Sequence, residues 1–544
     1  MSSPTSSSEH ALRRRRRLRI VIPAYPAVNI YSGVAKRMTA LGPVCVATAV
    51  NEVAGWDVEV IDENNYIRRA PRDETGLPDH EVLQSTRPAE AVGFYGGLTS
   101  TVPRLYHLAK LYKKLGVTTI AGGQHFVGDN VAEALTHGVD FVATGEGEPV
   151  IRDFLAYLDG RTRREEIRGV AYLDEGRAVR TAPAELLTDF DALPIPDFSL
   201  VRFASIKIYP VGRVRGCGMD CEFCTVKGKP RYASPERLVE QIALLYETHG
   251  ARKFFVVDDL FGQDRAETLR LCRMLRTYQD KVRKRFEITV QIRLDKARDV
   301  ELLDAMRQAG IFLVAVGFES PIAEELTAMN KRLKPDEMVL LTRRFRRAGF
   351  RVHGMFIFGY PMTEGMTFRM DATERARRFR TFIRKAKLDT VQVLLPVPLP
   401  GTELRARLDR QNRIYPLDCI GWEYYDGNFP LFEPDEPLTA EGMQWSIHRI
   451  MGRFYRLKHM FSIGFHTMAF PTFLFYSHNV KAGWRSWSRR WWNSVFRFGG
   501  WLTLRRWRAE SKKARFSERL TRAKGALAEH APANTEKNPT GARA

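Results

Sequence analysis

The chain has 544 residues, 44% of them hydrophobic, and a formal net charge of +22 at pH 7. That length predicts about three domains with sizeable cores. Six cysteines, three of them clustered, argue against a disulfide framework and indicate a metal site in a reducing compartment. Between Lys481 and Lys524, 14 basic and 2 acidic residues leave +12 in one stretch. The rest is only mildly basic, which argues against a nucleic-acid groove across the whole chain.

The N-terminal end is basic. Residues 1–17 end in five consecutive arginines, and we expect a solvated, disordered arm there. The apolar run 18–23 is too short for the core of a secretory signal and is typical of a first strand.

Residues 18–165 alternate short apolar runs with amphipathic stretches, the pattern of a doubly wound parallel sheet flanked by helices. Glycine pairs at 96–97 and 122–123 follow two predicted strands, at the carboxyl edge where open α/β sheets bind ligands. Glycine lets a large flat ligand approach the backbone, although glycine after a strand is also common in simple turns. The predicted strands are 18–22, 57–61, 91–95, 118–121 and 141–143.

Residues 166–202 are predicted to be a linker. The stretch 165–180 is largely polar, with a turn expected at 174–176. Pro194 and Pro196 make the end of the linker stiff and extended.

Three cysteines then stand in a C-x3-C-x2-C pattern, at Cys217, Cys221 and Cys224. Soft thiolates this close together favour zinc or an iron–sulfur cluster. No fourth protein ligand stands nearby, and three thiolates on a four-iron cubane leave one iron open to a substrate or cofactor. A small buried hydrophobe is expected at each remaining cysteine: Cys45, Cys272 and Cys419.

This spacing, with Phe223 just before the last cysteine, resembles the signature loop of radical S-adenosylmethionine (SAM) enzymes. The resemblance implies a [4Fe-4S] cluster whose open iron chelates SAM, and an electron that splits the sulfonium to give a 5′-deoxyadenosyl radical. It also implies that residues 203–425 form a partial (β/α)6 barrel, with its chemistry at the carboxyl ends of the strands. Four of its strands are predicted at 253–257, 287–292, 313–318 and 352–358.

Polar residues at or just beyond those strands are the candidates for holding SAM. A carboxylate suits the ammonium group or the ribose hydroxyls, and an arginine suits the carboxylate. A strand-end cap or a plain ion pair remains open for each of them, and Tyr360 is a candidate substrate contact. The predicted SAM-binding residues are Phe223, Asp258, Asp259, Gln291, Arg293, Glu319 and Ser320.

Four segments of the first domain, 43–47, 55–62, 122–125 and 145–148, resemble the cobalamin-binding domain found ahead of some radical SAM domains. No Asp-x-His-x-x-Gly motif follows the first strand, so cobalt would lack that lower histidine ligand. The loop position of His125 suggests contact with the corrin or its nucleotide tail. The predicted cobalamin-binding residues are Gly96, Gly97, Gly122, Gly123, His125, Gly145 and Glu146.

Cobalamin and SAM in one chain imply hydrogen abstraction from an unactivated carbon, followed most simply by C-methylation of a hydrophobic lipid- or isoprenoid-like substrate. The relatives implied by the resemblance include the anaerobic magnesium-protoporphyrin monomethyl ester cyclase. Oxidative cyclisation or carbon–carbon coupling therefore remains open. A non-catalytic cobalamin or redox sensor is a third hypothesis. An electron donor such as flavodoxin or ferredoxin is the implied protein partner.

The last part of the chain is predicted to be helical. Residues 426–480 form a helical C-terminal domain, with an amphipathic helix at 438–460. The run 460–480 lacks Asp, Glu, Lys and Arg and approaches spanning length, but histidines, a proline and hydroxyls dilute it. We expect it to be packed or interfacial.

Residues 481–528 combine an aromatic stripe with arginines, the composition of a helix on an anionic bilayer, with a bend or end at Gly499–Gly500. Docking on the protein's own core remains open. We expect a cytoplasmic enzyme, peripheral on the inner face of the cell membrane, with no nucleic-acid partner and a disordered tail at 529–544. The predicted membrane contacts are Trp484, Trp487, Trp491, Arg485, Arg489 and Arg490.

Overall fold

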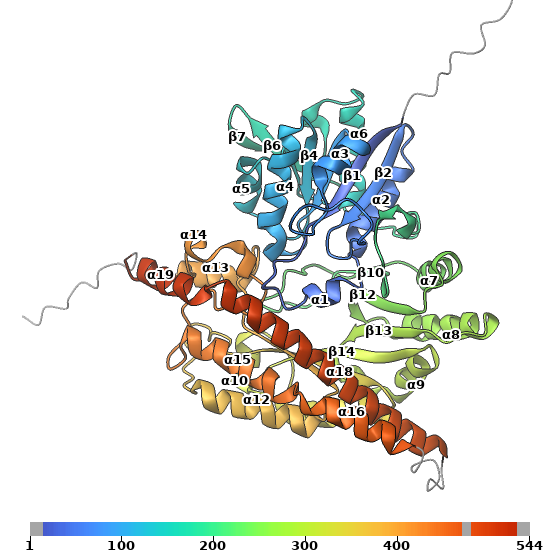
Figure 1. The fold of residues 1–544 in the computed structure, drawn as a ribbon, viewed down its shortest axis with the longest axis vertical. Helices are drawn as coiled ribbons and strands as arrows, with labels where there is room; N and C mark the ends of the chain where they lie inside the picture. Colours follow the sequence, from blue (N-terminus) through green and yellow to red (C-terminus); the bar gives the residue numbers. More distant parts are fainter. Residues whose placement is uncertain (1–14, 471–479, 530–544) are drawn as a thin grey trace, which may run out of the picture.

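A computed structural model describes residues 15–470 and 480–529. The first domain and the barrel domain lie one above the other along the longest axis, and the C-terminal helices cross one side of the barrel domain (Figure 1). The predicted arm at 1–14 and the tail at 530–544 fall outside the described residues.

The first domain is built on an eight-stranded sheet in the order β7-β6-β5-β4-β3-β1-β2-β8. Its central strands β5-β4-β3-β1-β2 are parallel, so the chain winds in both directions from β1, as the alternating pattern predicted. The strands are β1 Arg16–Ile22, β2 Trp56–Asp62, β3 Ala91–Tyr95, β4 Thr118–Gly122, β5 Phe141–Ala143, β6 Val170–Asp174, β7 Arg177–Arg180 and β8 Val201–Arg202.

The helices of this domain pack on the sheet because their apolar faces become buried there. Helix α6 buries Val150, Ile151, Phe154 and Leu155, at the spacing of one helical face. The helices are α1 Ser32–Ala35, α2 Leu41–Asn51, α3 His80–Thr86, α4 Val102–Lys114, α5 Asn130–Thr136 and α6 Gly147–Leu158.

Two boundaries differ from the sequence expectation. Strand β1 begins at Arg16, and Arg17 pairs with Asp57 on β2 at 2.9 Å, so the end of the arginine run belongs to the sheet. The predicted linker also contributes strands. Strands β6 and β7 form a hairpin around the predicted turn at 174–176 and extend the sheet beyond β5. Pairing between β6 and β7 thus satisfies part of the backbone of this polar stretch.

The second domain contains a six-stranded, fully parallel sheet whose strands follow chain order, β9-β12-β13-β14-β15-β16. Helices join successive strands, which is the pattern of a partial (β/α)6 barrel. The strands are β9 Tyr209–Val211, β12 Lys253–Phe261, β13 Glu287–Ile292, β14 Ile311–Glu319, β15 Arg351–Ile357 and β16 Thr390–Leu394. The helices are α7 Pro235–His249, α8 Arg265–Lys281, α9 Val300–Gln308, α10 Ala323–Ala328, α11 Pro335–Arg347, α12 Ala372–Ala386, α13 Glu403–Arg410 and α14 Leu417–Ile420.

A short antiparallel hairpin carries the cysteine loop. Strands β10, Val214–Arg215, and β11, Arg231–Tyr232, pair at its base. All three clustered cysteines lie in the loop between them, and β10 contacts β12 of the barrel.

Four helices form the C-terminal region: α15 Ala440–Phe454, α16 Lys458–Met468, α18 Val480–Lys513 and α19 Phe516–Glu529. The expected bend at Gly499–Gly500 is wrong, because α18 runs through both glycines without a break. A Cβ on Gly500 would lie 2.4 Å from the Tyr455 ring. Glycine therefore allows α18 to pack closely against the end of α15.

Asp389 holds α18 to the barrel. Its buried carboxylate pairs with Arg346 at 2.8 Å and with Arg489 of α18 at 3.1 Å, and accepts from Asn493 at 2.8 Å. Arg489 also donates to the Phe350 carbonyl at 2.6 Å. Arg489, predicted to touch a membrane, is thus engaged with the protein itself.

Of the other predicted membrane contacts, some bind α16 and some are exposed. The indoles of Trp487 and Trp491 donate to α16, at the His466 carbonyl and at Thr467 Oγ1. Trp484 is 48% exposed and Arg490 is exposed, while the side chain of Arg485 lies outside the described residues. No helix among the described residues is long and apolar enough to span a bilayer.

We predict that Asp389→Ala loosens α18, because it leaves two partly buried guanidinium groups without their counter-ion. The free energy of unfolding should fall by about 3 kcal/mol, measured by urea denaturation. Asp304→Ala, which removes an exposed carboxylate, should change it little.

The ion pairs of Asp389 also make the stability of the protein depend on pH. Burial raises the pKa of Asp389, but Arg489 and Arg346 outweigh it and leave the pKa below its ordinary value. The stabilisation is therefore present above the ordinary aspartate pKa and is lost as the pH falls through the lowered one. Equal acid sensitivity in wild type and Asp389→Asn would contradict this account.

Candidate functional site

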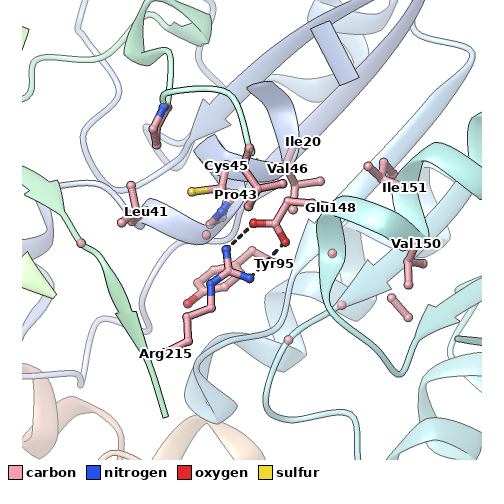
Figure 2. Close-up of a pocket in the computed structure, with 18 of the residues that line it drawn as sticks. Ile20, Leu41, Pro43, Cys45, Val46, Tyr95, Glu148, Val150, Ile151 and Arg215 are labelled. Carbon is pink, nitrogen blue, oxygen red and sulfur yellow. Dashed lines mark hydrogen bonds and ion pairs between the residues drawn. The ribbon is translucent and has the colours of Figure 1, made fainter. Parts of the chain in front are cut away.

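Two cavities meet near the cysteine loop. The interdomain cavity, about 460 Å³, lies between the carboxyl edge of the first sheet and the start of the barrel domain (Figure 2). The cysteine cavity, about 200 Å³, lies at the carboxyl ends of β12, β13 and β14. Asp259 belongs to the walls of both.

The cysteine cavity gathers most of the predicted site. All three clustered cysteines, which span eight residues of the loop, line this cavity. Five of the seven predicted SAM-binding residues line it too: Phe223, Asp259, Gln291, Arg293 and Glu319. Asp258 and Ser320 do not.

Asp258 and Asp259 fix the start of the cysteine loop. Strand β12 continues to Phe261, so both lie within the strand and not beyond it as expected. The carboxylate of Asp258 accepts the backbone N–H groups of Arg213 and Val214 at 2.6 and 3.0 Å, and Asp259 accepts that of Gly216 at 2.7 Å. Burial raises the pKa of Asp258 to about 6. Asp258 therefore positions the loop from behind.

Glu222 holds the loop from inside. Its carboxylate accepts from Arg407 at 2.6 and 3.0 Å and from the Tyr360 hydroxyl at 2.6 Å, all three side chains being buried. Arg407 also donates to the Met362 carbonyl at 2.8 Å. A carboxylate between two of the three cysteines is thus anchored to the segment after β15 and to α13. Tyr360, a candidate substrate contact by sequence, is 1% exposed and serves this anchor.

Charged groups face the cysteines across the cavity. Glu319 pairs with Lys331 at 2.8 Å, and Arg293 donates to Met219 Sδ at 3.1 Å. Glu319 has a φ of 58°, a left-handed conformation that strains a non-glycine residue. Ser320 instead binds Glu325 and accepts from the Ile322 N–H at 3.1 Å.

Lys331 and Met219 escaped the sequence analysis. Met219 stood inside the cysteine loop, which was a usable signal, but nothing marks Lys331, which follows α10 at no strand end. Burial lowers the pKa of Lys331, but Glu319 and Cys221 outweigh it and leave the pKa raised. An ammonium group beside the thiols suits an anionic centre.

The chemistry of this donor set fits an iron–sulfur cluster with an open position. Three soft thiols line one wall, with a cation at their side and polar groups opposite. Burial raises the pKa of the Cys217 and Cys221 thiols, because removal from water disfavours the charged thiolate. Among the described residues, no three His, Cys, Asp or Glu side chains are already arranged to hold a metal ion. Of the other cysteines, Cys272 is buried, while Cys45 and Cys419 are half-buried.

Two of the predicted cobalamin-binding glycines, Gly96 and Gly123, allow their loops to pack closely together. Gly123 has a φ of 134°, and a Cβ on it would lie 2.5 Å from the Gly96 backbone. A Cβ on Gly96 would lie 2.4 Å from the Phe126 ring. Of the seven predicted residues, Gly122, Gly123 and Gly145 line the interdomain cavity, and Gly96, Gly97, His125 and Glu146 do not.

His125 is a packing residue in this structure. It is 1% exposed, lies edge-on to Trp422 of the barrel domain at 4.9 Å, and has Asn130 Nδ2 at 3.1 Å from its Nε2. Burial, with a smaller effect of Arg405, lowers the pKa of His125 to about 4. A neutral imidazole at this place joins the two domains.

Glu146 and Glu148 bind the base of the cysteine hairpin to the first domain. Glu146 pairs with Arg215 of β10 at 3.1 Å and with Arg231 of β11 at 2.9 Å. Glu148 also pairs with Arg215, as Figure 2 shows. Both guanidinium groups lie over the Phe190 ring, at 4.8 and 5.2 Å. We call these five residues the interdomain clamp.

With this geometry in place, comparison with known proteins defines the class. Residues 212–370, which include the three cysteines, match the model of the radical SAM superfamily. The chain therefore contains a radical SAM domain, as the cysteine spacing predicted.

Curated relatives include methyltransferases and a cyclase. The chain is 26% identical to the uncharacterized methyltransferase PH0819 of Pyrococcus horikoshii, over 57% of this chain and 68% of that protein. It is 28% identical to an anaerobic magnesium-protoporphyrin IX monomethyl ester cyclase of Cereibacter sphaeroides, over 41% and 38%. It is 23% identical to the hopanoid C-2 methylase of Rhodopseudomonas palustris, over 66% and 62%.

Solved structures share the fold. The methyltransferase TsrM of Kitasatospora setae, with cobalamin and a [4Fe-4S] cluster bound, is 17% identical, with a TM-score of 0.60 over 88% of this chain and 99% of that one. The cobalamin-dependent radical enzyme OxsB, with aqua-cobalamin bound, is 12% identical, with a TM-score of 0.62 over 95% and 84%. The chain therefore has the fold of these cobalamin-dependent radical SAM enzymes, as predicted.

We predict that Glu222→Gln destabilises the cysteine loop, since Arg407 loses its counter-ion in a buried site. The free energy of unfolding should fall by about 3 kcal/mol, and the iron bound per chain after anaerobic reconstitution should drop. Glu403→Gln breaks an exposed pair with Lys227 of the same loop, 64% and 36% exposed, and should leave both quantities nearly unchanged. Equal iron content in the two variants would contradict the anchor.

We also predict that Glu146→Gln loosens the clamp while leaving the first domain folded. Hydrogen–deuterium exchange of residues 212–233 should rise, corresponding to about 1–3 kcal/mol of lost stabilisation. Glu52→Gln, which breaks the exposed pair with Arg152 in the same domain, is the matched control. If exchange of the hairpin is the same in both variants, the clamp does not hold it.

Proposed function

We propose that this protein is a cobalamin-dependent radical SAM C-methyltransferase that acts on a hydrophobic lipid- or isoprenoid-like substrate. The observation that carries the proposal is the position of Asp259 in the walls of both cavities. A group bound in the interdomain cavity and one bound in the cysteine cavity would then be neighbours, with substrate between them.

Each side of the cysteine cavity has a proposed part. Cys217, Cys221 and Cys224 would hold a [4Fe-4S] cluster, which supplies the electron that cleaves SAM. Arg293 and Lys331 suit the carboxylate of SAM, since both are cations in the wall of the cysteine cavity. The acceptor groups of Asp259, Gln291 and Glu319 suit its ammonium group and ribose hydroxyls. Phe223 offers an aromatic surface from the loop itself.

The interdomain cavity is the proposed cobalamin site. Its walls are largely apolar and include the carboxyl ends of β3 and β4, where sheets of this type bind ligands. Gly122, Gly123 and Gly145 give the ligand access to backbone there. Cobalamin would supply a carrier for the methyl group, and the clamp would keep its domain registered on the cysteine hairpin.

Two features support a hydrophobic substrate at a membrane. One relative is a hopanoid methylase, and the C-terminal helices combine exposed aromatic side chains with basic residues. We therefore propose a cytoplasmic enzyme associated with the inner face of the membrane. A flavodoxin or ferredoxin would deliver the electron.

A second candidate is oxidative cyclisation. The similarity to a magnesium-protoporphyrin cyclase favours it, because the same cofactor pair can lead from a substrate radical to ring closure without methyl transfer.

Anaerobic turnover with methyl-labelled SAM, dithionite and cobalamin separates these outcomes. The panel of substrates is squalene, a hopanoid and a polyprenyl phosphate, with products followed by mass spectrometry. We expect 5′-deoxyadenosine together with one labelled methyl group in a product. Product formation with 5′-deoxyadenosine but no label would favour cyclisation or coupling, and SAM binding without any cleavage would overturn the enzymatic proposal.

A further inference from the structure

Helix α16 exposes a row of large apolar side chains at the opposite end of the molecule from the first domain (Figure 1). Leu457, Phe461, Phe465 and Met468 follow at steps of four, four and three residues and therefore share one helix face. They are 42%, 67%, 71% and 83% exposed. A contiguous exposed apolar surface of this kind marks an interaction site.

The other face of α16 is already occupied by α18. Ser462 Oγ lies 3.0 Å from Ser494 Oγ, and the Trp487 indole donates to the His466 carbonyl at 2.9 Å. Because Arg489 in turn fixes α18 to Asp389, α16 is held with its apolar row pointing away from the protein. The tryptophans predicted to enter a membrane instead support the helix that presents the row.

The stretch of sequence that contains α16 carries charge of a single sign. Residues 442–509 contain twelve Lys and Arg and neither Asp nor Glu. Arg453 is exposed at the end of α15, Arg456 and Lys458 at the start of α16, and Arg490 on α18. Basic side chains beside an exposed apolar helix face suit a layer of anionic headgroups above an apolar interior.

We propose that α16 is the element that docks this protein on an anionic lipid bilayer. The row Leu457, Phe461, Phe465 and Met468 enters the headgroup region, and the basic residues around α16 bind lipid phosphates. This deepens the proposed membrane association by naming its contact surface. A second copy of the chain is disfavoured as the occupant, since two such basic faces repel each other, and nucleic acid offers nothing to bury an apolar row.

Co-sedimentation of the full chain with vesicles tests the proposal. The vesicles contain phosphatidylglycerol and phosphatidylcholine, or phosphatidylcholine alone. The variant Phe461→Ser, Phe465→Ser, Met468→Ser should bind anionic vesicles at least about tenfold more weakly, because three apolar side chains no longer enter the bilayer. The matched control is Leu186→Ser, Val300→Ser, Leu340→Ser, whose side chains are 63%, 77% and 50% exposed on other elements.

The control should bind as wild type does, and both variants should melt as wild type does, because all six positions are exposed. Wild type should bind far less to neutral vesicles and release from anionic ones at high salt. Unchanged binding by the α16 variant would overturn the proposal. So would equal binding to neutral vesicles, or a wild-type dimer that the variant abolishes while its vesicle binding persists. Sedimentation requires no turnover, so this result is independent of whether SAM is cleaved or a methyl group transferred.

Discussion

The contact between the first domain and the base of the cysteine hairpin is the constraint on which the site depends. Glu146 and Glu148 of the first domain hold Arg215 and Arg231, one on each strand of that hairpin. A loop of this length has no fold of its own. Its position is fixed by the clamp on one side, by Asp258 and Asp259 of β12 behind it, and by Glu222 and Arg407 from within.

Carboxylates therefore do most of the positioning around this site. Asp258, Asp259 and Glu222 accept hydrogen bonds in buried or half-buried places, where an unpaired partner would be costly. Because these carboxylates hold the loop, other charged residues in the cavity wall can contact ligands, such as Arg293, Glu319 and Lys331. The site is rigid at its back and chemically varied at its face.

The same principle governs the C-terminal region. Asp389, buried in the barrel, binds Arg489 of α18, and α18 then supports α16. Arg489, which the composition assigns to a membrane, thus binds α18 to the barrel. The exposed apolar face instead lies on the neighbouring helix α16. Deleting α18 would remove the buried Trp507 and uncover core residues packed against it, such as Phe429, so its removal would not isolate a surface effect.

The sequence by itself determined the fold class and the class of chemistry. Three cysteines at fixed local spacing predict a cluster site within one short segment, and strand periodicity located β3, β5 and β13 at their observed bounds. Only the tertiary structure decided which polar residues face the cavity. Asp258 and Asp259 are neighbours in one strand and both accept from the loop backbone, yet only Asp259 also lines both cavities. Lys331, Glu222 and His125 owe their roles to segments far away in the chain, and local patterns carry no record of such contacts.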